Sequence, residues 1–176
     1  MWQRFRYRVW QLGQIMRARP LPPAAHQEIA VILSPAEQSL FYQFSRSDQG
    51  HSYRVMRLLQ LRGEENQALL AAALLHDIGK TRVTLHWWER VVIVLAMVAG
   101  KDATARWGQG EPYGWRKALV VKAQHPTWGA EMVQAIGGHP LTIRLIRYHQ
   151  DVLAPDAAAT PENNLLRSLQ WADDQS

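Results

Sequence analysis

The spacing of apolar residues predicts helices along most of the chain. In several segments apolar side chains recur three or four positions apart, which is the period of one face of an α-helix. Near the N-terminus these positions are Trp2, Phe5, Val9, Leu12 and Met16. The expected helices span about residues 1–19, 34–44, 47–62, 64–75, 85–99, 126–136, 140–150 and 161–173. We therefore expect an all-α fold.

Residues that favour helix ends support these boundaries. Ser34-Pro35-Ala36-Glu37 combines a capping serine, a proline at the first helical position and an acid at the third. Pro20-Leu21-Pro22-Pro23 stops the first helix and is expected to form a stiff spacer. We divide the chain into a basic amphipathic helix with its spacer, residues 1–23, and a single helical domain, residues 24–176.

Length and composition agree with one folded domain. A chain of 176 residues with 47% hydrophobic content can bury a sizeable core. The chain has no cysteine, so thiolate metal ligands, disulfides and cysteine nucleophiles are excluded. No signal peptide is visible, and the longest apolar run, residues 91–99, is far shorter than the roughly 20 residues of a membrane span. The expected location is the cytoplasm.

The net charge of +5 equals the contribution of one segment. Residues 1–19 contain five arginines and no acidic residue, so residues 20–176 are formally neutral. One interpretation is that the apolar stripe packs on the domain while the arginines face solvent. The other is a peripheral contact of residues 1–19 with an anionic membrane surface or a protein partner. Nucleic acid has weaker support, because no recognition motif accompanies the charge.

The main chemical signal lies between residues 71 and 80. Five strong helix formers without polar side chains, residues 71–75, are followed directly by His76-Asp77-Ile78-Gly79-Lys80. A buried imidazole and carboxylate need compensation, which a divalent cation provides. Gly79 suits the left-handed conformation that ends many helices, which would place Lys80 near the site. A His-Asp pair that only caps a core helix is the alternative.

Further potential ligands recur at a regular interval. His51 precedes His76 by 25 residues, and His149 follows His125 by 24. Asp173 follows His149 by another 24 residues. A hairpin of two helices with short connections returns the chain to the same end of a helical bundle after about two dozen residues. Side chains at this interval can therefore converge on one site.

These segments resemble the HD-domain superfamily of metal-dependent phosphohydrolases. The resemblance runs from about Ser34 to the C-terminus and places the family's His…His-Asp…Asp pattern on His51, His76-Asp77 and Asp173. It implies a single-domain HD-type helical bundle with a metal site in its core. Leu74-Leu75-His76-Asp77-Ile78-Gly79-Lys80 is similar to the most recognisable segment of the HDIG and HD-GYP branches.

The same resemblance implies a place for a second metal ion. In those branches a similar His-Pro…Gly segment, here beginning at His125-Pro126, supplies a ligand, and His149 would be its partner. Pro126 is expected to open a helix and to leave His125 just outside it. Tyr148 stands where the two-metal branches carry the first of two histidines, and the Gly-Tyr-Pro signature is missing.

The predicted function is hydrolysis of a phosphate ester, for example of a nucleotide or a cyclic or linear dinucleotide. One or two divalent ions (Mn, Fe, Ni, Co or Zn) would be bridged by Asp77, and a hydroxide between them would attack phosphorus. Lys80 would stabilise charge on the phosphoryl oxygens. The alternatives are a di-iron oxygenase on a similar scaffold and a non-catalytic domain that senses a nucleotide or a metal.

Other features were interpreted as structural or left open. His86 and His139 were excluded from the metal site, the first because it falls outside the recurrent interval and the second because it follows a helix that leads away from the site. The glycine- and aromatic-rich loop over residues 107–115 was interpreted either as a surface loop packed by its own rings or as a lid over the substrate opening.

Overall fold

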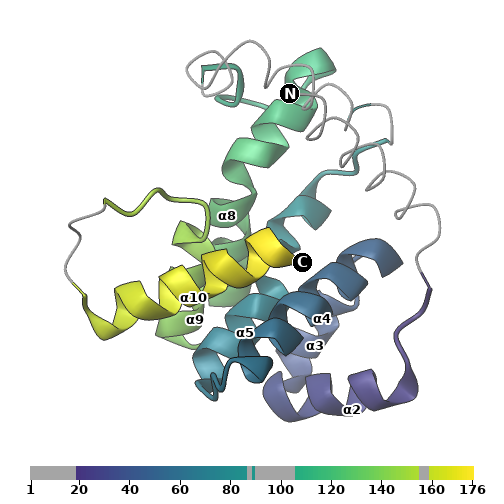
Figure 1. The fold of residues 1–176 in the computed structure, drawn as a ribbon. Coiled ribbons are helices and arrows are strands. Elements are labelled where there is room, and N and C mark those ends of the chain that lie inside the picture. Colours follow the sequence, from purple (N-terminus) through teal and green to yellow (C-terminus); the bar gives the residue numbers. More distant parts are fainter. Residues whose placement is uncertain (1–18, 87–88, 90–105, 155–158) are drawn as a thin grey trace, which may run out of the picture.

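The computed structural model describes residues 19–86, 89, 106–154 and 159–176 (Figure 1). Within these ranges the chain forms helices and no strand, which confirms the predicted all-α fold. The α-helices are α2 (Pro23–Ile32), α3 (Pro35–Phe41), α4 (Arg46–Leu61), α5 (Gln67–Leu75), α8 (Lys117–Ala135), α9 (Pro140–Tyr148) and α10 (Pro161–Gln175). Two short 3₁₀-helices are η1 (Ile78–Arg82) and η3 (Gly114–Arg116).

Side-chain caps fix where several helices begin. The predicted capping box is present at α3, where the Ser34 hydroxyl accepts from the Glu37 N–H and the Glu37 carboxylate accepts from the Ser34 N–H. Ser45, Asn66 and Thr160 cap α4, α5 and α10 in the same way, each accepting from an N–H of the first turn. Each cap satisfies a backbone donor that would otherwise have no partner within the helix.

Several predicted boundaries differ from the structure by up to three residues, and helix α2 was not predicted. The helix expected to begin at Ser47-Asp48 begins at Arg46, because the hydroxyl of Ser45 accepts a hydrogen bond from the Asp48 N–H. Pro23, which was assigned to the spacer, is the first residue of α2. Proline suits that position, since its missing N–H would have no partner there.

α5 lies at the centre of the molecule and is buried on all sides. Every residue from Ala68 to Leu75 is buried. Helices α2, α3, α4, α9 and α10 pack against it, and their apolar side chains join those of α5 in one core (Figure 1). The first titratable side chains after this apolar helix, His76 and Asp77, are also buried. The sequence thus carries two polar groups into the middle of the molecule.

α8 is a continuous helix that passes through Pro126. The prediction that a helix starts at Pro126, with His125 outside it, is therefore wrong. The residues before His125 are helical because the turn from Ala118 to Val121 is buried. Val120 and Val121 of this turn form a second apolar cluster with Trp128, against which Val83 and Leu85 pack.

Parts of two predicted helices fall outside the described residues. The basic helix over residues 1–19 is described only at Arg19, and the helix over residues 85–99 only at Leu85, His86 and Glu89. The division of the chain at residue 23 and the contact expected of residues 1–19 therefore stay predictions. Among the described residues, no helix combines the length and the apolar character needed to cross a membrane.

Candidate metal centre

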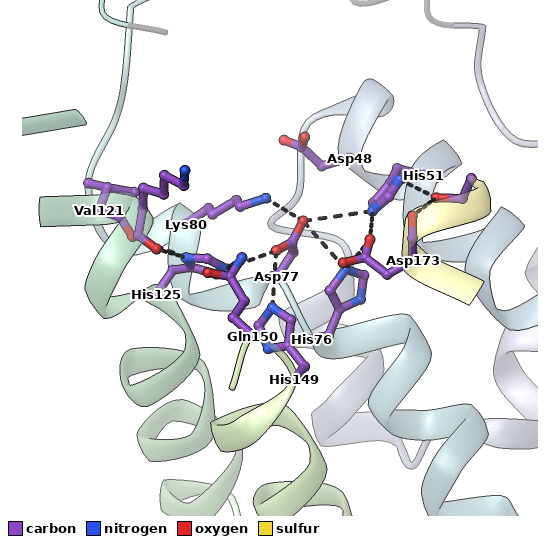
Figure 2. Close-up of polar contacts among 12 residues, drawn as sticks. Asp48, His51, His76, Asp77, Lys80, Val121, His125, His149, Gln150 and Asp173 are labelled. Carbon is purple, nitrogen blue, oxygen red and sulfur yellow. Dashed lines mark hydrogen bonds and ion pairs between the residues drawn. The ribbon is translucent and has the colours of Figure 1, made fainter. Parts of the chain in front are cut away.

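The structure brings together all six residues that the sequence analysis selected as metal ligands (Figure 2). They come from parts of the chain that are far apart in sequence. His51 belongs to α4, His76 and Asp77 follow α5, His125 belongs to α8, His149 follows α9, and Asp173 belongs to the last turn of α10. We refer to these six residues as the His/Asp cluster. Their role as metal ligands stays a prediction.

Asp77 lies at the centre of the cluster. Its Oδ1 atom lies 3.1 Å from His125 Nε2 and 3.9 Å from His149 Nε2. Its Oδ2 atom lies 3.5 Å from His76 Nε2 and 3.9 Å from His51 Nε2. The two carboxylate oxygens face different pairs of imidazoles, so one side chain is shared by two groups of potential ligands, His51-His76-Asp77 and Asp77-His125-His149.

Asp173 adds a second carboxylate to the first group. Its Oδ1 atom lies 3.0 Å from His51 Nε2 and 3.5 Å from His76 Nε2. The neighbouring Asp174 is exposed to solvent. The spacing of Leu166, Leu169 and Asp173 had favoured Asp173 over Asp174, and the structure places Asp173 in the cluster.

The outer nitrogens of the four imidazoles determine which way the rings face. The Nδ1 atoms of His76 and His149 lie 2.9 Å and 2.7 Å from the carbonyl oxygens of Ala73 and Ile146. His125 Nδ1 lies within hydrogen-bond distance of backbone carbonyls as well. A carbonyl oxygen can only accept, so these Nδ1 atoms carry the hydrogen and the Nε2 lone pairs face Asp77.

His51 differs from the other three histidines in its outer partner. Its Nδ1 atom lies 2.8 Å from the hydroxyl oxygen of Ser176. That hydroxyl also lies 3.2 Å from the carbonyl oxygen of Asp173, so it connects His51 to the end of α10. With Nδ1 bonded outward, the His51 Nε2 atom faces the cluster as well.

This arrangement fits a divalent cation. The inward Nε2 atoms face carboxylate oxygens, so the arrangement needs positive charge between nitrogen and oxygen, supplied either by a proton or by a cation. The Nε2 atoms of His76 and His149 are fully buried and make no hydrogen bond with any residue that the structure describes. Buried polar atoms normally have partners, and a metal ion bound in each group of potential ligands would supply one to each of these two nitrogens. Imidazole and carboxylate are suitable ligands for Mn, Fe, Co, Ni and Zn.

The protonation states of the cluster also suit metal binding. Burial lowers the pKa of His149, and the neighbouring His76 lowers it further, to about 3. Burial raises the pKa of Asp77, but Lys80, His76 and His125 outweigh this effect and hold that pKa well below its usual range. At neutral pH His149 is thus neutral and Asp77 is ionised, which are the forms that bind metals.

The pKa of His76 shifts upward, in the opposite direction to that of His149. Burial lowers its pKa, but the nearby carboxylates of Asp77 and Asp173 outweigh burial and raise the pKa to about 9. Without a metal ion, a proton on His76 therefore supplies part of the positive charge that the two carboxylates attract. A metal ion that binds to the His76 ring must displace this proton.

Lys80 points toward the cluster from η1. Its Nζ atom lies 2.5 Å from Asp77 Oδ2, and its side chain is 41% exposed (Figure 2). Partial burial lowers the pKa of Lys80, whereas the charges of Asp77 and Asp48 raise it, and the net shift is upward. The side chain is therefore an ammonium group that reaches both solvent and the central carboxylate.

Gly79 has a different role from the one expected. It does not adopt a left-handed conformation, and the prediction that it ends α5 in that way is wrong. It lies instead where η1 meets α8, and a Cβ atom there would overlap the carbonyl oxygen of His125 and lie 2.6 Å from the Gly129 nitrogen. Glycine thus allows the close approach that brings Asp77 to His125.

Two residues of the site were not found from the sequence. Gln150 directly follows His149, and its Nε2 atom lies 3.4 Å from His125 Nε2 (Figure 2). Ser176 contacts His51 as described above. Adjacency to His149 was a usable signal for Gln150, whereas no pattern in the sequence distinguishes Ser176 from other serines. Neither of the two excluded histidines belongs to the two groups of potential ligands: His139 caps α9, and the His86 N–H donates to Glu89.

The loop over residues 107–115 is attached to the region around His125. Arg116 donates to the carbonyl oxygens of Trp107 and Gln109, at 3.2 Å and 2.7 Å. The amide of Gln124, the residue before His125, donates to the carbonyl oxygens of Gly108 and Gly110 at 3.4 Å and 3.0 Å. The rings of Trp107 and Trp115 meet edge to face, while Tyr113 is 86% exposed.

Comparison with known proteins gives one match. A sequence model of the HD domain family matches residues 49–175. The matched segment covers most of the chain and contains the whole His/Asp cluster, Lys80 and Gln150. No curated protein and no solved structure gave a significant match.

Proposed function

The chain belongs to the HD domain family of metal-dependent phosphohydrolases, and from this membership we propose that it hydrolyses a phosphate ester at the His/Asp cluster. The observation that carries the proposal is the central position of Asp77, whose two oxygens face two different groups of imidazoles. A carboxylate shared in this way is suited to holding two cations close together.

We assign the residues to two ions as follows. His51, His76 and Asp173 would hold the first ion, and His125 and His149 the second, with Asp77 shared between them. When bound, such ions supply Lewis acidity toward a phosphoryl oxygen and lower the pKa of water. The outer hydrogen bonds of the four histidines keep the rings in the orientation that this binding needs.

Lys80 is proposed to bind the phosphoryl group. Its ammonium group lies beside Asp77 and reaches solvent, so a substrate that approaches the centre can meet it. Phosphoryl transfer develops negative charge on the non-bridging oxygens, and a fixed ammonium group stabilises that charge. The contact between Lys80 and Asp77 holds the ammonium group in place before the substrate arrives.

A nucleotide or a dinucleotide is the proposed substrate class. The support for a base lies in the loop over residues 107–115, which Gln124 ties to the helix that carries His125. Tyr113 and Trp115, which are 86% and 56% exposed, offer flat apolar surfaces on which a base can stack. We place the chain nearest the HDIG branch, because Leu74-Leu75-His76-Asp77-Ile78-Gly79-Lys80 resembles it and the Gly-Tyr-Pro signature is missing.

A screen of metals against substrates tests this function. The purified protein would be loaded separately with Mn²⁺, Fe²⁺, Co²⁺, Ni²⁺ or Zn²⁺ and assayed for phosphate release from nucleoside monophosphates and for cleavage of linear and cyclic dinucleotides. We expect turnover with at least one ion, its loss on chelation and its return when the ion is restored.

Parallel aerobic and anaerobic assays complete the test. Hydrolysis should proceed equally well with and without oxygen. Oxygen consumption without cleavage of a phosphate ester would contradict the proposal in favour of an oxygenase. Metal and nucleotide binding without turnover under any of these conditions would contradict it in favour of a sensor domain.

A further inference from the structure

The chain contains two His-Pro dipeptides in different structural settings. His139-Pro140 lies at the beginning of α9, where proline is the first helical residue and needs no N–H partner. His125-Pro126 lies inside α8, where proline interrupts the backbone hydrogen bonds of the helix. A proline in the second setting is costly, so its presence beside a cluster residue requires an explanation.

The hydrogen bonds around Pro126 explain why a proline is tolerated inside α8. In a regular helix the N–H of residue 126 would donate to the carbonyl oxygen of residue 122, four positions earlier. Proline has no N–H, and the carbonyl oxygen of Lys122 instead lies 2.9 Å from His125 Nδ1. The same nitrogen lies 3.1 Å from the carbonyl oxygen of Val121. The imidazole thus occupies the place of the backbone donor that proline lacks.

This contact determines which nitrogen of His125 faces the cluster. Both backbone oxygens can only accept, so Nδ1 carries a hydrogen and Nε2 is the nitrogen left to bind a metal ion. His125 Nε2 is directed at Asp77 Oδ1, at 3.1 Å. The ring is fully buried and has no room to adopt many other orientations.

We propose that Pro126 is a positioning residue for His125: by removing the N–H at position 126, it makes the Lys122 carbonyl available to His125 Nδ1 and so holds Nε2 toward Asp77. The inference rests on the proposed role of His125 as a metal ligand. A purely structural role for Pro126, such as bending α8 toward η1, requires no particular state of the His125 ring.

Pro126→Ala separates the two roles, because it should change stability and metal affinity in opposite directions. Alanine restores a helical N–H that competes for the Lys122 carbonyl. We expect the midpoint of thermal unfolding of the metal-free protein to rise, since an interior proline is removed. The affinity for the ion assigned to His125 and His149, measured by calorimetric titration with Mn²⁺, should fall about tenfold, as for the loss of other outer contacts of metal ligands.

The second His-Pro dipeptide supplies the matched control. Pro140→Ala changes the same dipeptide at a helix start, and its Mn²⁺ affinities should equal those of the unchanged protein. His125→Ala provides the reference for loss of the ligand itself. If His125→Ala leaves the Mn²⁺ stoichiometry unchanged, the assignment of the second ion fails. If His125→Ala lowers the Mn²⁺ stoichiometry but Pro126→Ala leaves the Mn²⁺ affinities unchanged, the positioning role of Pro126 is overturned while the assignment of the second ion stands.

A measurement on the unchanged protein tests the proposal independently of any variant. Nitrogen NMR of the histidine rings in the metal-free protein reports which nitrogen carries the hydrogen. The proposal requires a hydrogen on Nδ1 of His125, protected from exchange by the two backbone carbonyls. Exchange of that hydrogen as fast as in an exposed histidine, or its absence from Nδ1, would overturn the proposal.

Discussion

At the scale of single residues, Asp77 differs from every other member of the His/Asp cluster because both groups of imidazoles depend on it. Replacing it with alanine removes the only carboxylate that faces His125 and His149 within the described cluster. It also leaves several buried imidazoles close together without that charge. We therefore expect Asp77→Ala to abolish metal loading and turnover together.

Elemental analysis of the purified variant checks this prediction. His139→Ala, in a histidine that caps α9, should keep the full metal content. Unchanged metal content in Asp77→Ala would mean that the cluster is not the metal site.

Lys80 should affect the rate but not the metal content. Its ammonium group approaches Asp77 from the solvent side, and loss of one donor to a transition state typically costs about two to three orders of magnitude in kcat. Lys80→Ala should therefore bind the normal amount of metal and turn over slowly. Arg82→Ala is the matched control on η1, since Arg82 pairs with Glu131 at 2.9 Å on the surface. Equal kcat values for the Lys80 and Arg82 variants would refute a catalytic role for Lys80.

Metal binding should release a proton at neutral pH. Asp77 and Asp173 raise the pKa of His76 to about 9 against the effect of burial, so the metal-free protein carries a proton there at pH 7. Because this proton must leave, the affinity for the first ion should rise with pH, roughly tenfold per unit, and level off above pH 9.

Calorimetry at pH 7 in buffers with different ionisation enthalpies counts this proton. We expect roughly one proton released as the first ion binds. In His76→Ala the residual binding should occur without this release. A first binding step that releases no proton at pH 7 in the unchanged protein would show that His76 is already neutral.

At the scale of elements, the site depends on how closely η1 approaches α8. A Cβ atom on Gly79 would overlap the His125 carbonyl oxygen, so Gly79→Ala must move one backbone away from the other. We expect destabilisation of roughly 3 kcal/mol, as for other overpacked sites, together with weaker binding of the ion assigned to His125 and His149. Thermal unfolding and Mn²⁺ titration measure the two effects.

Gly50 provides the opposite case beside another cluster residue. It lies inside α4 next to His51, and a Cβ atom there would meet only the flexible Arg54 side chain, at 3.5 Å. Gly50→Ala should therefore stabilise the protein by about 0.5–1 kcal/mol and leave metal binding unchanged. If both alanine variants lost stability equally, close approach at Gly79 would not be the cause.

These glycines show what the sequence could and could not predict. The apolar period and the capping residues predicted most of the helices, though not α2 or the first half of α8, and the interval of about two dozen residues together with the family resemblance led to the six residues that the structure brings together. The role of Gly79 depends on α8, which lies far along the chain, and no local pattern reports such a contact.

The setting of Pro126 differs from the predicted one for a related reason. Proline is common at the first position of a helix, and Pro140 behaves in that way. Pro126 lies inside α8 because burial of the preceding turn, Ala118 to Val121, favours helix on its N-terminal side. Local propensity was outweighed by packing, and the difference between the two prolines becomes visible only once the partners of each helix are known.

At the scale of the whole molecule, the hydrophobic core begins earlier in the chain than the segment that matches the family. The match begins at residue 49, whereas the core already includes Ala25, Ile29, Ile32 and Leu33. α2 is also held by polar contacts, since its Glu28 carboxylate accepts from Tyr53 and Arg57 of α4. Gln67 of α5 donates to the Ile32 carbonyl oxygen at 2.8 Å. The segment before the family match is therefore a part of the folded unit.

This organisation predicts different outcomes for two truncations. Removing residues 1–33 takes away three large buried side chains, and at about 1.5–3 kcal/mol for each the loss approaches the whole stability of a typical domain. It also uncovers α5, whose end carries His76 and Asp77. We expect this shortened chain to lose cooperative thermal unfolding and to bind little metal. Removing residues 1–19 leaves α2 and its contacts in place, so this shorter deletion should keep cooperative unfolding and the metal content. Circular dichroism and elemental analysis of the two shortened proteins make the comparison. Cooperative unfolding and full metal content after removal of residues 1–33 would show that the segment matched by the family folds without α2.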